Sequence, residues 1–524
     1  MKGSEKAMDV YLIAPMPTFG LDTLVSDKVV HLNERYALMA AAGIATVAAF
    51  FDSDFGLRLC DELIEDVDFE DPSEVICISM NVAQAARGIE IARRFRAMGR
   101  TVIMGGAHVS LAPEVFEGEA ECLVIGEMEP VAEEFVRNLR DGQLKPRYHG
   151  SKADMAQSPP PRWDLYRNDR AVSGVVQTSR GCPFECNFCD VIQYLGRTQR
   201  HKPTEAVIAE TQSLYDHGYR SIQLSDDNFT VYRQRTRTLL DALAAWNGRD
   251  GRDPVQFITQ ASIDLARDDD LLQRCNEAGV RDIFIGIETS NIEALKESKK
   301  RQNLRQDLVQ QTGKIVEAGI AVTSGMMVGF DADDLSCFER QFAFGMALPI
   351  VTLRVTVLVA PIATPLYAQM KAEGRLFRNG EEDVFPGGDL WTNIEPLNMS
   401  REQLAEGAVW LVNALLEPDN VIRRFEHMTS LLGTPPEHLR RPLHQKMGGT
   451  GAAAMLKLMR VGAKDPGARR VIEAVNELSK ARPEISWDLA TALSSYLNSY
   501  LSVKQLQGHR TKSGRQIAAY ADAS

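Results

Sequence analysis

The chain has 524 residues, of which 44% are hydrophobic and 25% charged, and its formal net charge is −12. This composition is ordinary for a globular protein, and the acidic balance argues against a nucleic-acid-binding protein, which usually carries a basic surface. No run of ~18 apolar residues predicts a transmembrane segment, and no secretory signal is recognisable, so we expect a cytoplasmic protein.

Short apolar runs alternate with helical patterns over residues 1–150. The predicted strands are 10–14, 44–50, 75–79, 101–104 and 122–125, and the predicted helices are 34–42, 83–98 and 130–140. This alternation predicts an α/β domain with a doubly wound, Rossmann-like parallel sheet. A ligand of such a sheet would lie at the carboxyl ends of its strands.

The loops that follow these predicted strands are rich in glycine and polar residues, and glycine lets a ligand approach the backbone closely. The candidate contacts are Met16, Asn81, Gly105, Gly106, His108, Val109, Ser110, Gly126, Glu127 and Glu129. Ordinary turns between strands and helices also contain glycine, so these loops alone do not identify a cofactor.

A polar, proline-containing stretch at 151–171 predicts a linker. After it, six strand patterns alternate with helices up to residue 390, fewer than a complete eight-stranded TIM barrel needs. We therefore predict an open, partial (β/α)6 barrel over 172–390. From 391 to 524 the pattern is helical with little strand, which predicts a helical C-terminal domain.

Cys182, Cys186 and Cys189 follow the first predicted barrel strand with the spacing C-x3-C-x2-C. Thiolates are the usual ligands of iron–sulfur clusters, and three of them leave one iron of a four-iron cluster open to another ligand. A zinc site with His201 as the fourth ligand is an alternative. The other five cysteines are scattered, and we expect them to be buried as small apolar residues.

This segment resembles the cysteine signature of the radical S-adenosylmethionine (SAM) superfamily, including the aromatic Phe188 before the last cysteine. The resemblance implies a [4Fe–4S] cluster on the three cysteines and SAM bound at the open iron. Reductive cleavage of SAM would then give a 5′-deoxyadenosyl radical. The resemblance also implies a small-molecule substrate and an electron-donating partner such as flavodoxin or ferredoxin.

Polar segments after the later barrel strands match superfamily positions that contact SAM. They are Ser225, Asp226 and Asp227 after the second strand, Gln260 and Ser262 after the third, and Glu288 after the fourth. Glu288 could instead form an ion pair with Arg281 or Lys299. Arg197 and Arg200 could bind a carboxylate or lie on the surface, and Ala363 stands where the family pattern has glycine.

The segments GGAHVS at 105–110, GEMEP at 126–130 and SDDNF at 225–229 resemble the cobalamin-binding branch, and in particular the hopanoid C-2 methylase-like and tetrapyrrole-methylating group. The motif D-x-H-x-x-G is absent, so we expect no histidine ligand to cobalt. The resemblance implies methylation of an unactivated carbon with cobalamin. Cyclisation, ring contraction or rearrangement on the same scaffold is an alternative, as is a non-catalytic binding protein.

Overall fold

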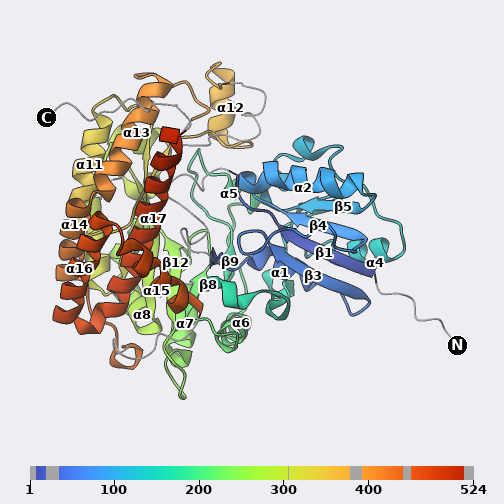
Figure 1. The fold of residues 1–524 in the computed structure, drawn as a ribbon, viewed down its shortest axis with the longest axis horizontal. Coiled ribbons are helices and arrows are strands. Elements are labelled where there is room, and N and C mark those ends of the chain that lie inside the picture. Colours follow the sequence, from blue (N-terminus) through green and yellow to red (C-terminus); the bar gives the residue numbers. More distant parts are fainter. Residues whose placement is uncertain (1–7, 19–34, 305, 378–391, 441–449, 513–524) are drawn as a thin grey trace.

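The computed structural model describes residues 8–18, 35–304, 306–377, 392–440 and 450–512. Two parallel sheets lie side by side, and the C-terminal helices pack around the larger sheet (Figure 1). No helix within these ranges is long and apolar enough to cross a membrane.

The first sheet is parallel, with the strand order β3-β1-β4-β5-β6-β7. Its strands are β1 (Met8–Ala14), β3 (Phe55–Asp61), β4 (Val75–Ser79), β5 (Thr101–Gly105), β6 (Cys122–Gly126) and β7 (Arg147–Gly150). Tyr11 and Ile13 of β1 pack with helix α2 (Ala85–Ala97), whereas Val10 and Leu12 pack with α1 (Ala42–Ala48) and α4 (Ala132–Arg140). The strand order reverses between β1 and β4, and ligands of open parallel sheets lie at such a reversal.

Several elements of this region differ from the prediction. The predicted strand 44–50 is wrong, because these residues lie in and just after α1, where Ile44, Ala45 and Ala48 are buried at helical spacing. A short apolar run with β-branched residues fits both the helical period of about 3.6 residues and the alternation of a strand. The predicted helix 34–42 contains strand β2 (Ala37–Met39) instead. Strands β3 and β7 escape prediction because they lie at the edges of the sheet, where charged residues are tolerated.

The second sheet is also parallel, with the order β15-β14-β13-β12-β11-β8-β2. Six of its strands confirm the predicted barrel: β8 (Ala171–Val176), β11 (Ser221–Leu224), β12 (Gln256–Ala261), β13 (Val280–Glu288), β14 (Ala321–Val328) and β15 (Leu353–Val357). The helices between them are α6 (Thr204–Asp216), α7 (Arg233–Trp246), α8 (Asp269–Ala278), α10 (Leu308–Glu317) and α11 (Cys337–Ala347). The seventh strand, β2, comes from the amino-terminal part of the chain, and its Ala37 pairs with Ala171.

The C-terminal helices pack against the open barrel. They are α13 (Arg401–Leu416), α14 (Pro418–Leu431), α15 (Thr450–Gly462), α16 (Pro466–Ala481) and α17 (Ser486–Lys512). Helix α13 packs against α11 and β15, and α15 packs against β8 and α17. The Thr491 hydroxyl of α17 donates a hydrogen bond to Gln256 Oε1 at the start of β12, at 3.2 Å. Helices α15 and α17 therefore lie at the amino ends of the barrel strands.

Candidate functional site

The three clustered cysteines lie in the loop after β8, at the carboxyl end of the barrel. Gly181, just before Cys182, has a φ of +100°, and a Cβ atom there would lie 2.6 Å from the Thr198 carbonyl oxygen. Only glycine fits this turn. Cys186 is buried and its sulfur accepts a hydrogen bond from Gln302 Nε2 at 3.6 Å, whereas Cys182 and Cys189 are partly exposed.

Asp226 and Asp227, both predicted SAM contacts, hold this loop in place. Asp226 is only 3% exposed and accepts hydrogen bonds from the hydroxyls of Thr178 and Ser179. Asp227 Oδ2 accepts from the backbone N–H of Gly181 at 2.6 Å. Burial raises the pKa of Asp226 to about 6, although the hydroxyl donors oppose that rise. Both carboxyl groups therefore position the segment that carries the cysteines.

The donor set fits an iron–sulfur cluster better than the zinc alternative. His201, the fourth ligand that zinc would need, packs edge-on against Tyr232 with 5.3 Å between ring centroids. Among the residues that the structure describes, no three His, Cys, Asp or Glu side chains are placed to hold one metal ion. Iron–sulfur clusters are held by cysteine thiolates, and this loop supplies three of them. The three cysteines thus fit a cluster with one open iron.

Glu288 lies at the barrel mouth in a strained conformation. Its φ is +64°, which is rare for a residue other than glycine, and the β13–β14 register shifts between Gly286 and Glu288. Its Oε1 accepts from Lys300 Nζ at 2.7 Å, so its partner is neither Arg281 nor Lys299, as the sequence suggested. The Lys300 ammonium lies 6.0 Å from the centroid of the Phe188 ring, beside the cysteine loop.

The remaining predicted SAM contacts lie at the ends of β11 and β12. Gln260 is exposed toward the interior of the barrel. Ser262 is buried, and its hydroxyl accepts a hydrogen bond from Asn228 Nδ2 at 2.5 Å. Ser225 borders the barrel interior on one side and a second cavity, at the edge of the first sheet, on the other.

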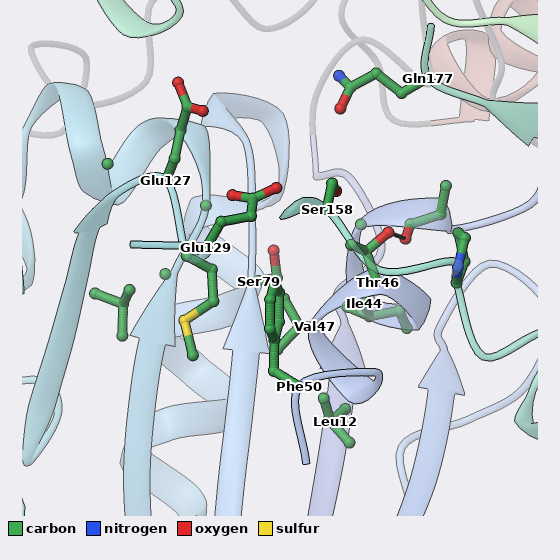
Figure 2. Close-up of a pocket in the computed structure, with 18 of the residues that line it drawn as sticks. Leu12, Ile44, Thr46, Val47, Phe50, Ser79, Glu127, Glu129, Ser158 and Gln177 are labelled. Carbon is green, nitrogen blue, oxygen red and sulfur yellow. Dashed lines mark hydrogen bonds between the residues drawn. The ribbon is translucent and has the colours of Figure 1, made fainter. Parts of the chain in front are cut away.

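This sheet-edge cavity has a volume of about 320 Å³ and lies where the strand order reverses. Figure 2 shows Leu12, Val47 and Phe50 at one end of the cavity, and Glu127, Glu129 and Gln177 toward the other. Strand ends and helix α1 form its walls, including the predicted contacts Gly105, Gly106, Gly126, Glu127 and Glu129. The cavity is apolar in its depth and polar where it approaches the barrel.

Two glycines at its rim are required by close backbone contacts. Gly106 has a φ of +102°, and a Cβ atom there would lie 2.5 Å from the Met80 carbonyl oxygen. Gly126 has a φ of +86°, and a Cβ atom would lie 2.1 Å from the Gly150 carbonyl oxygen. Any side chain would push neighbouring strand ends apart, so these glycines keep the rim compact.

Glu127 and Glu129 join the first sheet to the cysteine loop. Glu127 accepts hydrogen bonds from Arg180 and, through both carboxylate oxygens, from Arg200, at 2.7–2.8 Å. Glu129 Oε1 accepts from Arg180 at 2.7 Å. Burial alone would raise the pKa of Glu127, but the two arginines lower it overall. We call these four residues the inter-sheet ion network, and Arg180 lies two residues before Cys182.

The other predicted contacts of the sheet loops do not line the cavity. The Met16 N–H donates to Glu62 Oε2, and Asn81 caps the short helix that follows it. His108 of α3 (Ala107–Leu111) packs edge-on against Phe116, and Val109 is fully buried beside α2. Ser110 Oγ accepts from the Gly126 N–H at 2.8 Å and ties α3 to the end of β6.

Sequence reasoning overlooked several residues of both regions. They are Gln177, Arg180, Lys300, Gln302 and the α1 residues Ile44, Thr46 and Val47. Arg180 carried a usable signal, because it adjoins the cysteine motif. Lys300 and Gln302 approach the loop only through the fold, so no local pattern marks them. Arg200, by contrast, does bind a carboxylate, that of Glu127, and Arg197 pairs with Glu185 near the surface.

Comparisons with known proteins agree with this geometry. Residues 176–341 match the model of the radical SAM superfamily, and residues 364–484 match a domain of unknown function, DUF4070. The uncharacterized methyltransferase sll1242 of Synechocystis is 32% identical over 72% of this chain and 70% of that protein. The hopanoid C-2 methylase of Rhodopseudomonas palustris is 27% identical over 76% of this chain and 75% of that protein.

A solved structure has the same fold. The radical SAM methyltransferase TsrM of Kitasatospora setae, determined with cobalamin and a [4Fe–4S] cluster bound, superimposes with a TM-score of 0.62. The match covers 91% of this chain and all of that chain, at 15% sequence identity. At this identity the likeness concerns the arrangement of the two sheets and the C-terminal helices.

Proposed function

This chain belongs to the radical SAM superfamily, and we propose that it methylates an unactivated carbon of a small molecule, using a cobalamin as well as the cluster. An unactivated carbon is a poor nucleophile and needs radical chemistry. When bound, the cluster and SAM would supply a 5′-deoxyadenosyl radical, and a cobalamin would supply the methyl group. The protein contributes binding, orientation and exclusion of water.

The observation that carries the proposal is that Ser225 lines two cavities. One is the sheet-edge cavity, and the other is the interior of the barrel. A substrate at this junction would have the cluster loop on one side and the sheet-edge ligand on the other. A methyl donor and a radical source must both reach one carbon, and this arrangement suits that requirement.

The residues available for a cobalamin are those of the sheet-edge cavity. Its volume of about 320 Å³ suits part of such a molecule, and the rest would lie toward the barrel. His108 is turned toward Phe116 and not toward the cavity, which supports the expectation that no histidine binds cobalt. A pulsed electron paramagnetic resonance spectrum of the cob(II)alamin protein tests this point, since nitrogen hyperfine coupling from an axial histidine would contradict it.

The stoichiometry of by-products tests the reaction itself. Methylation by this route consumes two SAM molecules, one leaving as S-adenosylhomocysteine and the other as 5′-deoxyadenosine. With the true substrate, the two should form in a ratio near one after correction for uncoupled cleavage. Deoxyadenosine formed with turnover but without S-adenosylhomocysteine would reject methylation and favour cyclisation or rearrangement.

Variants of the SAM region test whether one site serves both SAM molecules. Asp227→Ala removes the acceptor of the Gly181 N–H, and Glu288→Ala removes the partner of Lys300. If both SAM molecules bind here in succession, each variant should slow both by-products together. Unchanged S-adenosylhomocysteine formation in these variants would indicate a separate methyl-donor site.

A further inference from the structure

A second cavity lies inside the barrel, below the positions predicted to contact SAM. It has a volume of about 420 Å³, within the range of small-molecule binding sites. Ser225 and Gln260 border it at the carboxyl ends of the strands, and Ser173, Ser221 and Asp282 border it nearer the amino ends. We call this cavity the barrel chamber.

Helices α15 and α17 close the chamber at the amino ends of the strands. Met455 and Leu458 of α15 and Trp487 of α17 give this floor an apolar part. Thr491, Ser494, Ser495 and Asn498 follow at helical spacing along one face of α17 and give it a polar part. The floor thus combines apolar area with a limited number of polar groups, as ligand sites do.

The floor is fixed to the barrel by specific contacts. Arg281 of β13 forms a buried, two-point ion pair with Asp488 of α17, with both N–O distances 2.9 Å. Thr491 is hydrogen-bonded to Gln256. A Cβ atom at Gly451 would lie 3.1 Å from the Val172 carbonyl oxygen, so α15 approaches β8 closely. The chamber is therefore a built feature and not a loose gap.

Asp282 places a carboxyl group at the wall of the chamber. Its Oδ2 accepts a hydrogen bond from Thr323 Oγ1 at 3.1 Å, but its Oδ1 is buried without a hydrogen-bond partner among the described residues. Burial raises the pKa of this carboxyl group to about 7, while Thr323 and Arg354 act against that rise.

We propose that α15 and α17 form the specificity-determining floor of a substrate chamber, and that the Asp282 carboxyl group at its wall accepts a hydrogen bond from a hydroxyl or ammonium group of a largely apolar substrate. The apolar body would extend from Asp282 toward Ser225, where the reacting carbon would lie. The inference rests on the proposed function for the identity of the reacting end. It assigns a role to α15, which lies within the segment matched to a domain of unknown function.

Binding of small cage compounds tests the chamber without any catalysis. The probes are 1-adamantanol, 1-adamantylammonium and 1-adamantanecarboxylate, measured by calorimetry on the anaerobic holoenzyme. We expect at least one of the two donor probes to bind ten times more tightly than the carboxylate. Tighter binding of the carboxylate, or no binding of either donor probe at millimolar concentration, would overturn the proposal.

Two adjacent residues of α15 supply a matched pair of variants. Met455→Trp places bulk in the chamber, whereas Leu456→Trp places it at a position that is 52% exposed. The first should abolish binding of the donor probes and the second should leave it unchanged. Equal binding by the two variants would overturn the proposed floor. Iron content and uncoupled SAM cleavage check that both variants fold.

Asp282→Asn keeps the chamber volume and so remains informative if Met455→Trp does not fold. The substitution should weaken 1-adamantylammonium at least tenfold, because the carboxylate is removed, and should not weaken 1-adamantanecarboxylate. An unchanged ammonium affinity would overturn the role of Asp282. Because these experiments measure binding and not methyl transfer, a result that contradicts the proposed chamber would leave the proposed reaction untested by the same data.

Discussion

The clustered cysteines differ from the other five in their surroundings. Cys275 of α8 is fully buried in the apolar core, whereas Cys182 and Cys189 are partly exposed in a loop held by charged and polar groups. Their spacing was the one site feature that the sequence marked without help from the fold. The residues that hold the loop, such as Arg180 and Lys300, make contacts that no local sequence pattern predicts.

Removing one clustered thiol should abolish cluster binding. We expect Cys186→Ala to lose the cluster and all formation of 5′-deoxyadenosine, because two thiolates cannot hold it in the same way. Iron and sulfide analysis, together with SAM cleavage under dithionite, measures both effects. Cys275→Ala is the matched control and should retain both, and a Cys186→Ala protein with a full cluster would refute the assignment.

Ala363 carries a backbone conformation that favours glycine. Its φ is +68°, at the position where the family pattern has glycine. The left-handed conformation costs an L-residue roughly 1–2 kcal/mol, and glycine avoids that cost. Glycine also increases the conformational entropy of the unfolded chain, which offsets part of the gain in stability. Ala363→Gly should therefore stabilise the α12 (Pro365–Ala372) region by about 0.5–1 kcal/mol, measured by hydrogen exchange of that helix.

The matched control lies inside the same helix. Ala368 is exposed in the middle of α12, where glycine is less favourable than alanine by about 1 kcal/mol. Ala368→Gly should therefore speed exchange in α12. If both substitutions speeded exchange, the positive φ at Ala363 would not be a source of strain.

At the scale of elements, the central strands of the first sheet were predictable and helix α1 was not. The predicted bounds of β4 agree with the structure to the residue, and those of β5 and β6 agree to within one residue. These elements have clear burial patterns, and their neighbours fix their ends. Helix α1 failed the prediction because seven small and β-branched residues fit either period, and only packing under the first sheet decides between them.

The inter-sheet ion network connects two elements that carry different parts of the site. Glu127 follows β6, and its partners Arg180 and Arg200 form the two short strands β9 (Ser179–Arg180) and β10 (Arg200–His201) beside the cysteine loop. The carboxylate of Glu127 is almost fully buried. Removing one partner of a buried ion pair leaves the other charge uncompensated, which costs about 3–5 kcal/mol.

Glu127→Ala should therefore lower both the thermal midpoint and the iron content, since the cysteine loop loses its attachment to the first sheet. Anaerobic thermal unfolding and iron analysis measure the two effects. Adding Arg200→Met to Glu127→Ala should restore part of the loss, because it removes one stranded charge. Arg93→Ala, which breaks the ion pair of Arg93 with Glu119, is the control and should cost less than about 1 kcal/mol. Normal iron content in Glu127→Ala would contradict the role of the network.

At the scale of the whole molecule, the chain crosses between its parts more often than the sequence suggested. Strand β2 lies within residues 1–150 yet pairs with β8 at the edge of the second sheet. Helix α17, near the other end of the chain, packs beneath the barrel through Arg281 and Thr491. Such long-range pairings produce no periodic pattern in the sequence. The three consecutive regions could therefore be predicted, but the contacts between them could not.

The ion pair between Arg281 and Asp488 joins residues 207 positions apart, and both side chains are buried. Asp488→Ala leaves the Arg281 guanidinium buried without its carboxylate, so we expect a loss of about 3–5 kcal/mol that falls mainly on α17. Hydrogen exchange should therefore speed up in α17 and at the amino ends of β12 and β13, while β1 and β4 of the first sheet keep their protection. Glu477→Ala in α16, whose ion pair with Lys480 is exposed, is the control and should change little.

Because α17 also forms the floor of the barrel chamber, the Asp488 variant should bind the cage probes more weakly while the cluster stays intact. Faster exchange spread evenly over both sheets would instead mean that the pair supports the whole fold and does not specifically hold the floor.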